Sequence, residues 1–481
     1  MITSPLFSDD TDKKWSTAEL ESMALAIESC LAAHFIGATV ATFSPGPVFT
    51  LFSLALKPGV RISKITALIP ELTRTLAVTG VQVVDYIPGT SLAGLLITNH
   101  SRQKVTLESM LNQPVFDESS SLLTLILGIE SSGKAVAIDL SRQPHLLVAG
   151  AANAGKSVLM HAMIVSLLYK LSPADIRLIL IDTNQLELTP YDGIPHLLTP
   201  VITDPKDAVK ALHWIIAEMK RRYMLFQALG ARNLDAYNQR MSDAETLSRP
   251  IPDPYWMPEA DKEQPFLCSL PRLVLLIEDY ADLMACDKLS EEMFVTLCRQ
   301  GHAAGIHLIL TTRTPLPNII TSRIKLNIPA RIALTVTTKS DSRLILDHAG
   351  AESLFGAGDL LYLPADSAIP VRIQSAYVND REIRNIVDAW KSKLAPCYIE
   401  GITKSAECGS PEPENELDPL FDQAVAFIIE KRRASISGIQ RQFRIGYNRA
   451  AHLVEQMESL GIVSPPGHDG SREVLAPPVI Y

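Results

Sequence analysis

The fold is decided by the stretch Gly150-Ala151-Ala152-Asn153-Ala154-Gly155-Lys156-Ser157. It satisfies the pattern G-x-x-x-x-G-K-[ST] of a phosphate-binding loop, follows apolar residues 145–149 and precedes a helical pattern that begins near Lys156. In such a loop the backbone N–H groups and the positive end of the helix bind phosphates. We therefore expect the eight residues to bind ATP, with Lys156 reaching the β- and γ-phosphate oxygens and Ser157 binding Mg²⁺.

Short apolar runs alternate with longer helical patterns on both sides of this loop, from residue 122 to about residue 393. The runs occupy residues 146–148, 178–181, 273–277 and 307–310. Runs of this kind are typical of buried parallel strands in an α/β sheet that helices cover on both faces. The proline-rich residues 249–271 interrupt the pattern and are expected to lie at the surface.

Two polar segments follow predicted strands and are candidates for catalysis. Glu278 and Asp279 come directly after residues 273–277, so Glu278 is expected at the metal and Asp279 at the attacking water. Thr311-Thr312-Arg313-Thr314 follows the next run, where Arg313 or a neighbour can sense the γ-phosphate, since ligands gather at the carboxyl ends of parallel strands. The alternatives are that the carboxylates only face solvent and that the second segment is a plain polar loop.

Changes in composition divide the chain into three domains and a linker. Residues 16–118 mix one helical pattern with short alternating segments and are expected to form a small α+β domain. Residues 119–395 hold the P-loop core. Residues 396–416 are rich in Gly, Ser, Pro and Glu, as a flexible linker is, and residues 417–478 are expected to fold as a separate module.

The last module has the pattern of a winged helix-turn-helix. Helices are predicted at residues 418–431, 435–443 and 447–460, followed by a hairpin that pairs residues 462–463 with 473–475. The third helix has an apolar face with the spacing i, i+3, i+4 and i+7, made by Ala450, Leu453, Val454 and Met457.

Polar residues of this module are candidates for contacts with duplex DNA. Asn448 and Arg449 lie on the opposite face of the third helix, and in a major groove Asn can pair with adenine and Arg with guanine. Three other arginines can hold phosphates: Arg441, Arg444 and Arg472. A winged helix can instead dock another protein, and this alternative stays open.

Composition excludes several classes of protein. The net charge of −9 rules out a generally basic surface, although a local basic patch is enough to bind DNA. No apolar run approaches the roughly 18 to 20 residues that cross a bilayer, and residues 1–15 lack the pattern of a signal peptide. The six cysteines are scattered, without the spacing of disulfides or of a zinc site. We expect a cytoplasmic protein.

Over nearly its whole length the chain resembles the FtsK/SpoIIIE family of double-stranded DNA translocases. Residues 43–48 (FSPGPV) look like the family's α domain, residues 194–198, 251–256 and 303–308 are similar to its β domain, and residues 431–477 to its γ domain. The resemblance implies a RecA-like motor that hydrolyses ATP in a homohexameric ring around duplex DNA. It also implies a γ domain that reads guide sequences and activates the XerC and XerD recombinases, and a role in chromosome segregation at cell division. The family's N-terminal membrane anchor has no counterpart in this sequence. We therefore expect either a truncated form or a soluble paralogue.

The departures from the family concentrate in the predicted catalytic site. Residues 151–154 replace Thr, Thr, Gly and Ser, although Asn153 tolerates the left-handed backbone angles that the loop needs. Glu278-Asp279 inverts the order Asp-Glu, Arg313-Thr314 replaces Gln-Arg, Asn184 replaces Lys, and His302 replaces Arg. Two alternatives to a working motor therefore stay open. One is a hydrolysis-deficient, nucleotide- and DNA-binding ring subunit or regulator, and the other is an interaction protein whose γ domain only docks a recombinase.

Overall fold

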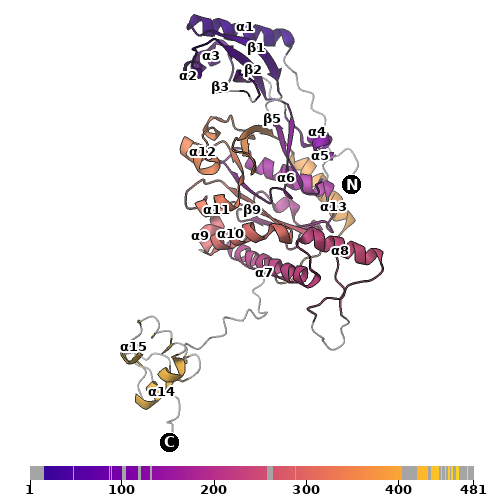
Figure 1. Cartoon of the computed structure of the whole chain (residues 1–481), viewed down its shortest axis with the longest axis vertical. Coiled ribbons are helices and arrows are strands. Elements are labelled where there is room, and N and C mark those ends of the chain that lie inside the picture. The colour runs from indigo at the N-terminus through magenta and orange to yellow at the C-terminus, as the bar shows by residue number, and fades with distance from the viewer. Residues whose placement is uncertain are drawn as a thin grey trace. The chain divides into compact units, whose positions relative to one another are not determined.

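The computed structural model divides into two compact units, Met1–Lys404 and Ser405–Tyr481 (Figure 1). In the first unit it describes residues 16–403, apart from 47, 86, 88, 100–103, 118–120, 131–132, 257–263 and 288. In the second it describes residues 420–431, 435–443, 446, 450, 453–454, 457–458, 462–464 and 474.

The large sheet of the first unit has nine strands, of which five adjacent ones are parallel. In spatial order these are β11 (Ala330–Leu334), β7 (His145–Ala149), β10 (Ile306–Thr312), β9 (Arg272–Glu278) and β8 (Ile176–Asp182). The four apolar runs of the sequence are thus confirmed as neighbouring parallel strands. Beyond β11 the sheet continues with antiparallel strands: β12 (Asp359–Leu363), β13 (Val371–Ser375), β5 (Thr124–Glu130) and β6 (Ala135–Asp139).

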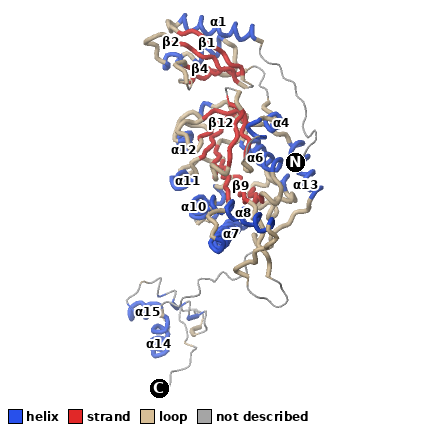
Figure 2. Tube along the Cα trace, turned by 45° about the vertical axis from the view of Figure 1, so that its right-hand side comes forward, coloured by secondary structure: helices blue, strands red, loops and turns tan. Residues whose placement is uncertain are grey.

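Helices cover both faces of this sheet (Figures 1 and 2). Successive strand residues point to opposite faces, so that in β7 Leu146 and Val148 join one core while Leu147 and Ala149 join the other. The first core includes α6 (Lys156–Lys170) and α13 (Asp380–Lys393). The second includes α7 (Pro205–Leu229), α8 (Leu234–Thr246), α9 (Ala281–Cys286), α10 (Ser290–Gln300), α11 (Ser322–Asn327) and α12 (Lys339–Leu346). Single 3-10 turns are η1 (Thr189–Tyr191), η2 (His302–Ala304) and η3 (Ala351–Ser353).

The N-terminal part of this unit is the α+β domain that the sequence predicts. Its antiparallel sheet has the order β1 (Ala38–Pro45), β2 (Phe49–Leu56), β4 (Ala93–Thr98) and β3 (Val81–Val84). The helices that pack on it are α1 (Thr17–Ala33), α2 (Ile62–Ala67) and α3 (Ile69–Thr75). Ser16 begins α1 through a capping box with Glu19, which satisfies backbone N–H groups of the first turn.

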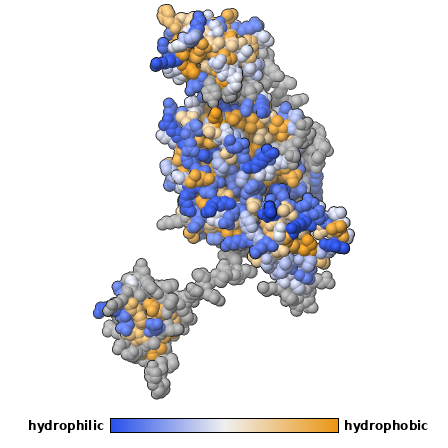
Figure 3. All heavy atoms as spheres, in the orientation of Figure 1, coloured by the Kyte–Doolittle hydropathy of each residue, from blue (hydrophilic) through white to orange (hydrophobic). Residues whose placement is uncertain are grey.

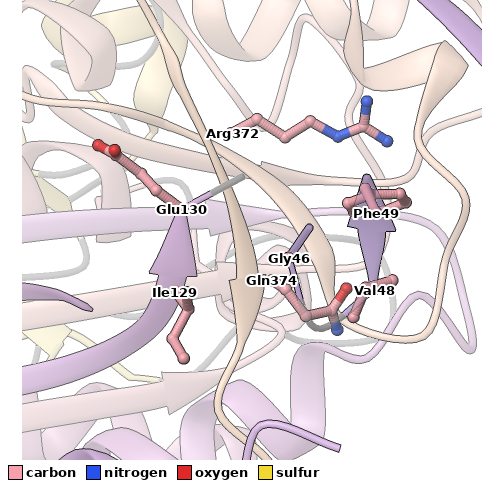
Figure 4. A pocket seen from close by; sticks show the side chains of 7 residues that line it. All are labelled: Gly46, Val48, Phe49, Ile129, Glu130, Arg372 and Gln374. Atoms are coloured by element: carbon pink, nitrogen blue, oxygen red, sulfur yellow. The ribbon is translucent and has the colours of Figure 1, made fainter. Parts of the chain in front are cut away.

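Arg372 of β13 joins this small sheet to the large one (Figure 4). Its guanidinium donates to both oxygens of the buried Asp359, at 2.6 and 2.9 Å. It also contacts Gln82 of β3 and lies over the ring of Phe49 of β2, 4.5 Å from the ring centre. One arginine thereby ties two strands of the core to two strands of the N-terminal sheet.

The short helices α4 (Leu107–Leu111) and α5 (Pro114–Asp117) pack with the large sheet. Val105, Leu107, Met110 and Phe116 are buried in the same core as α6. We therefore propose that the boundary between the first two domains lies near residue 100, ahead of the residue 118 that composition suggests.

The second unit contains the elements of the predicted winged helix-turn-helix. Its first two helices are α14 (Phe421–Lys431) and α15 (Ile436–Phe443). The four residues predicted as the inner face of the third helix are helical and completely buried, which confirms that prediction: Ala450, Leu453, Val454 and Met457. Val463 pairs with Val474 in an antiparallel bridge, as expected of the wing. The chain is α/β, with a RecA-like P-loop core, an N-terminal α+β domain and a C-terminal winged helix-turn-helix.

Hydrophilic side chains cover much of the first unit's face in Figure 3, with apolar ones interspersed. None of the helices in the described part of the chain has both the length and the apolar character needed to cross a membrane.

Candidate nucleotide-binding site

The predicted phosphate-binding loop connects β7 to α6, as the sequence implies. Asn153 and Gly155 adopt left-handed backbone angles, with φ of 60° and 100°. A Cβ atom at Gly155 would lie 2.6 Å from the backbone N of Gly358, so this position has no room for a side chain. The loop therefore turns sharply at two residues, and one of them has to be glycine.

Backbone hydrogen bonds hold the loop against the ends of neighbouring strands. Gly150 N donates to the Thr312 carbonyl at 3.3 Å, and Ala151 N to the Thr335 carbonyl at 2.9 Å. Gly358 N donates to the Ala154 carbonyl at 3.1 Å. The loop thus lies at the carboxyl edge of the parallel strands and lines a cavity of about 330 Å³ at the N-terminus of α6.

Lys156 is buried at the base of this cavity, with only 5% of its side chain exposed. Within the described residues its Nζ makes no hydrogen bond, and it lies 3.7 Å from Oε1 of Glu278. Burial lowers the pKa of the Lys156 ammonium, although the nearby charges of Glu278 and Asp279 oppose this shift. A buried cation with unused donors suits an anionic ligand, because added acceptors would offset its lost hydration.

Glu278 is the last residue of β9 and is completely buried. Arg313 donates to its Oε1 from Nη2 at 2.6 Å and from Nε at 3.0 Å. Asn184 donates to its Oε2 at 3.0 Å. Both oxygens of Glu278 are therefore engaged, Oε1 by the Arg313 guanidinium and Oε2 by the Asn184 amide.

Asp279 leaves the strand direction, with a left-handed φ of 57°. Its Oδ1 accepts a hydrogen bond from the Thr312 hydroxyl at 3.0 Å, and its N–H donates to the Thr311 hydroxyl at 3.3 Å. The predicted acidic pair and the predicted sensor segment are thus in direct contact, although Asp279 faces a threonine and Glu278 faces Arg313.

Ser157 contacts a carboxylate that the sequence did not single out. Its hydroxyl donates to Oε1 of Glu187 at 2.6 Å, and both residues line the cavity. The contact with His161, whose Nε2 is 3.7 Å from Oε2, is the largest cause that lowers the pKa of Glu187. Glu187 follows β8 by five residues, so its position at a strand's carboxyl end was the available signal.

A second cavity, of about 380 Å³, adjoins the first through the shared residues Gly155 and Val158. Val48 and Tyr377 contribute to its lining, and Nζ of Lys104 lies 5.0 Å from the Tyr377 ring centre. The two cavities together offer a polar compartment beside one with apolar and aromatic walls.

The oxygen ligands that Mg²⁺ prefers are present at this edge of the sheet. The Ser157 hydroxyl and the Glu187 carboxylate line the cavity, and Oδ1 of the buried Asp182 has no hydrogen-bond partner among the described residues. No group of three or more His, Cys, Asp and Glu residues in the described part forms a metal site. Mg²⁺ fits such a place if nucleotide phosphates and water supply the other ligands.

The predicted DNA contacts are described only in part. Arg441 lies exposed on α15. The other four predicted contacts, Arg444, Asn448, Arg449 and Arg472, lie outside the residues that the structure describes.

Three family models match the chain. The FtsK/SpoIIIE family model matches residues 106–333, the FtsK alpha domain residues 4–99, and the FtsK gamma domain residues 415–477. Two solved structures show a weaker likeness. The pCW3 conjugation coupling protein TcpA is 20% identical with a TM-score of 0.48, over 76% of this chain and 99% of that one. The cytoplasmic domain of the Thermomonospora curvata type VII secretion ATPase EccC is 20% identical with a TM-score of 0.49, over 62% of this chain and 35% of that one.

Curated relatives are similar over nearly the whole chain. The DNA translocase FtsK of Vibrio vulnificus is 47% identical over 95% of this chain and 48% of its own length. The DNA translocase FtsK of Pseudomonas aeruginosa is 45% identical over 97% of this chain and 59% of its own length. The chain spans about half the length of the curated relatives it matches. With a P-loop core, an α domain and a γ domain in the family's order, the chain belongs to the FtsK/SpoIIIE family.

Proposed function

We propose that the chain is a subunit of an ATP-dependent motor that moves along double-stranded DNA. The observation that carries this proposal is Lys156, a buried ammonium without hydrogen-bond partners among the described residues, at the end of a glycine-turned loop. The γ domain supports DNA as the partner, and the curated relatives are named DNA translocases. By the family's example the motor is a homohexamer that serves chromosome segregation at cell division, with its γ domain reading guide sequences and activating XerC and XerD.

In this proposal each residue around the cavity has a separate task. Residues 150–157 bind the phosphates of ATP, with Lys156 at the β- and γ-phosphates. Glu278 and Asp279 act at the metal and the attacking water, and Arg313 responds to the γ-phosphate. When bound, Mg²⁺ would neutralise charge that develops on the phosphate oxygens. The neighbouring cavity, with Tyr377 in its wall, suits the base of the nucleotide.

The second candidate is a subunit that binds ATP and DNA but hydrolyses ATP poorly or not at all. It is favoured by the contacts of Glu278, whose two oxygens are held by Arg313 and Asn184, and by the hydrogen bond from Thr312 to Asp279. A carboxylate held in this way has to break these hydrogen bonds before it can bind Mg²⁺ or activate the attacking water. A misplacement of about 1 Å in such a group can cost on the order of a hundredfold in rate.

The deciding experiment is ATP hydrolysis by the purified chain with and without long duplex DNA. Turnover that DNA stimulates, and that Lys156→Ala abolishes, is the expected result for a working motor. ATP binding without turnover would favour the second candidate, and an absence of ATP binding would contradict both.

A further inference from the structure

If the Ser157 hydroxyl binds Mg²⁺, its proton needs a hydrogen-bond acceptor. The inference drawn from this requirement rests on the nucleotide-binding function proposed above. A hydroxyl group ligates a cation through an oxygen lone pair, so its single proton has to point to another acceptor. In this structure that acceptor is Oε1 of Glu187, at 2.6 Å. A distance this short is typical of an O–H group that donates to a carboxylate.

Besides Ser157, Glu187 contacts two residues, Asp182 and His161. Its backbone N–H donates to Oδ2 of the fully buried Asp182 at 2.9 Å. Its Oε2, the oxygen that Ser157 does not use, lies 3.7 Å from Nε2 of His161. His161 is in turn fixed by Tyr191, since its Nδ1 lies 3.0 Å from the buried hydroxyl group of Tyr191. The carboxylate therefore has a defined position before any ligand binds.

Glu278, the acidic residue expected beside Ser157, is engaged elsewhere. Its Oε1 accepts two hydrogen bonds from Arg313 and its Oε2 accepts one from Asn184. The acceptor that Ser157 uses comes instead from the loop that follows β8. This loop is distinct in sequence from the paired acidic residues at the end of β9.

We propose that Glu187 is a positioning residue for magnesium-dependent nucleotide binding. By accepting the hydrogen bond that the Ser157 hydroxyl donates, it leaves the lone pairs of that hydroxyl free for the cation. Its negative charge, which lines the same cavity, also favours a divalent cation beside the phosphates. Glu187 thus selects for the magnesium complex of the nucleotide over the free nucleotide.

The test measures binding of fluorescently labelled ATP to the full chain, in Mg²⁺ and in EDTA. In Glu187→Gln we expect affinity in EDTA to stay within about twofold of the unchanged chain or to rise, because a negative charge near the phosphates is removed. The enhancement by Mg²⁺ should fall by about 10- to 100-fold, because the neutral amide oxygen is a weaker acceptor for the Ser157 hydroxyl and the charge that attracts the cation is gone. Glu292→Gln, on the exposed side of α10, is the matched control and should change neither value.

A double variant provides a second measurement. If Glu187 acts partly through Ser157, Glu187→Gln should reduce Mg²⁺-ATP affinity by a smaller factor in the Ser157→Ala background than in the unchanged chain. Full magnesium enhancement in Glu187→Gln would overturn the inference while leaving the proposed function intact. Failure of the unchanged chain to bind ATP in either condition would overturn the proposed function, and the inference with it.

If Glu187→Gln binds ATP more weakly in EDTA, the variant Glu187→Asp provides the deciding measurement. This variant keeps the charge and withdraws it by one methylene group, so it should bind ATP in EDTA and retain only part of the magnesium enhancement. An unchanged enhancement in the aspartate variant would count against the role of the short contact with Ser157.

Discussion

The pH dependence of stability can be worked out for His196, a residue of the first unit's core. Its ring is fully buried, its Nε2 lies 3.1 Å from the Leu171 carbonyl oxygen, and it meets the Trp390 ring edge-on with ring centres 4.6 Å apart. Burial lowers the pKa of His196 from 6.5 to about 4, because a charged ring would lose its hydration. The informative change is His196→Gln, since the glutamine amide can donate to the same carbonyl and does not titrate.

The sign of the effect follows from proton binding. Between pH 6.5 and about 4 the unfolded chain protonates His196 while the folded chain does not. Acid therefore favours the unfolded state, and stability is lost as the pH falls from above 6.5 towards 4. With these two pKa values, the free energy of unfolding should fall by about 2 kcal/mol between pH 7 and pH 5 through His196 alone.

The assay is urea unfolding of the unchanged chain and of His196→Gln at both pH values. Unfolding is monitored by tryptophan fluorescence, to which Trp390, beside residue 196, contributes. The variant is expected to be the less stable protein at pH 7, because the edge-on ring contact is lost. At pH 5 the difference between the two proteins should shift by about 2 kcal/mol in favour of the variant. An equal difference at both pH values would refute the argument, since it would mean that His196 titrates alike in both states.

Three further outcomes are expected. Gly155→Ala should raise the Kd for ATP by at least about tenfold in a calorimetric titration, because its Cβ would lie 2.6 Å from Gly358 N and a left-handed alanine adds about 1 to 3 kcal/mol of strain. Asn153→Gly should bind ATP like the unchanged chain and Asn153→Val more weakly, since valine tolerates a φ of 60° poorly; equal binding by both would contradict this. In DNA titrations Arg449→Ala should cost about 1 to 3 kcal/mol and relax base preference, whereas Arg441→Ala should weaken all sequences alike and reduce the salt slope by about 1. Identical effects of the two arginine changes on every sequence would contradict their assignment.

Local patterns were sufficient to predict the parallel strands and the loop between β7 and α6. The apolar runs are short, continuous and rich in Leu, Ile and Val, a pattern that favours buried strands over amphipathic helices. The left-handed turn at Asn153 also follows from residue type, because asparagine is one of the few non-glycine residues that adopt it readily. The winged helix was predictable for the same reason, since its third helix keeps a regular apolar face.

Contacts between separate strands were not predictable in this way. The strands that extend the sheet beyond β11 include two local antiparallel pairs, β12–β13 and β5–β6, which belong to one sheet because β13 pairs with β5, more than 200 residues away in the sequence. Glu187 was not predicted because its one sequence signal, a position five residues after β8, does not identify Ser157 as its partner. Its role depends on the loop after β8 folding back over α6, which the chain fixes through Asp182 and His161.

Strand geometry determines which of the two residues Glu278 and Asp279 points towards Lys156. Glu278 has the same alternation as Val274 and Leu276, so its side chain points to the face that α6 covers, towards Lys156. The next residue would point to the other face, but Asp279 leaves the strand with its left-handed φ and contacts Thr312. An exchange of the two residues therefore moves the longer side chain to Lys156 and the shorter one away from it. In the proposed motor, ATP phosphates would compete with Glu278 for Lys156, and Glu278 would then depend on its hydrogen bonds with Arg313.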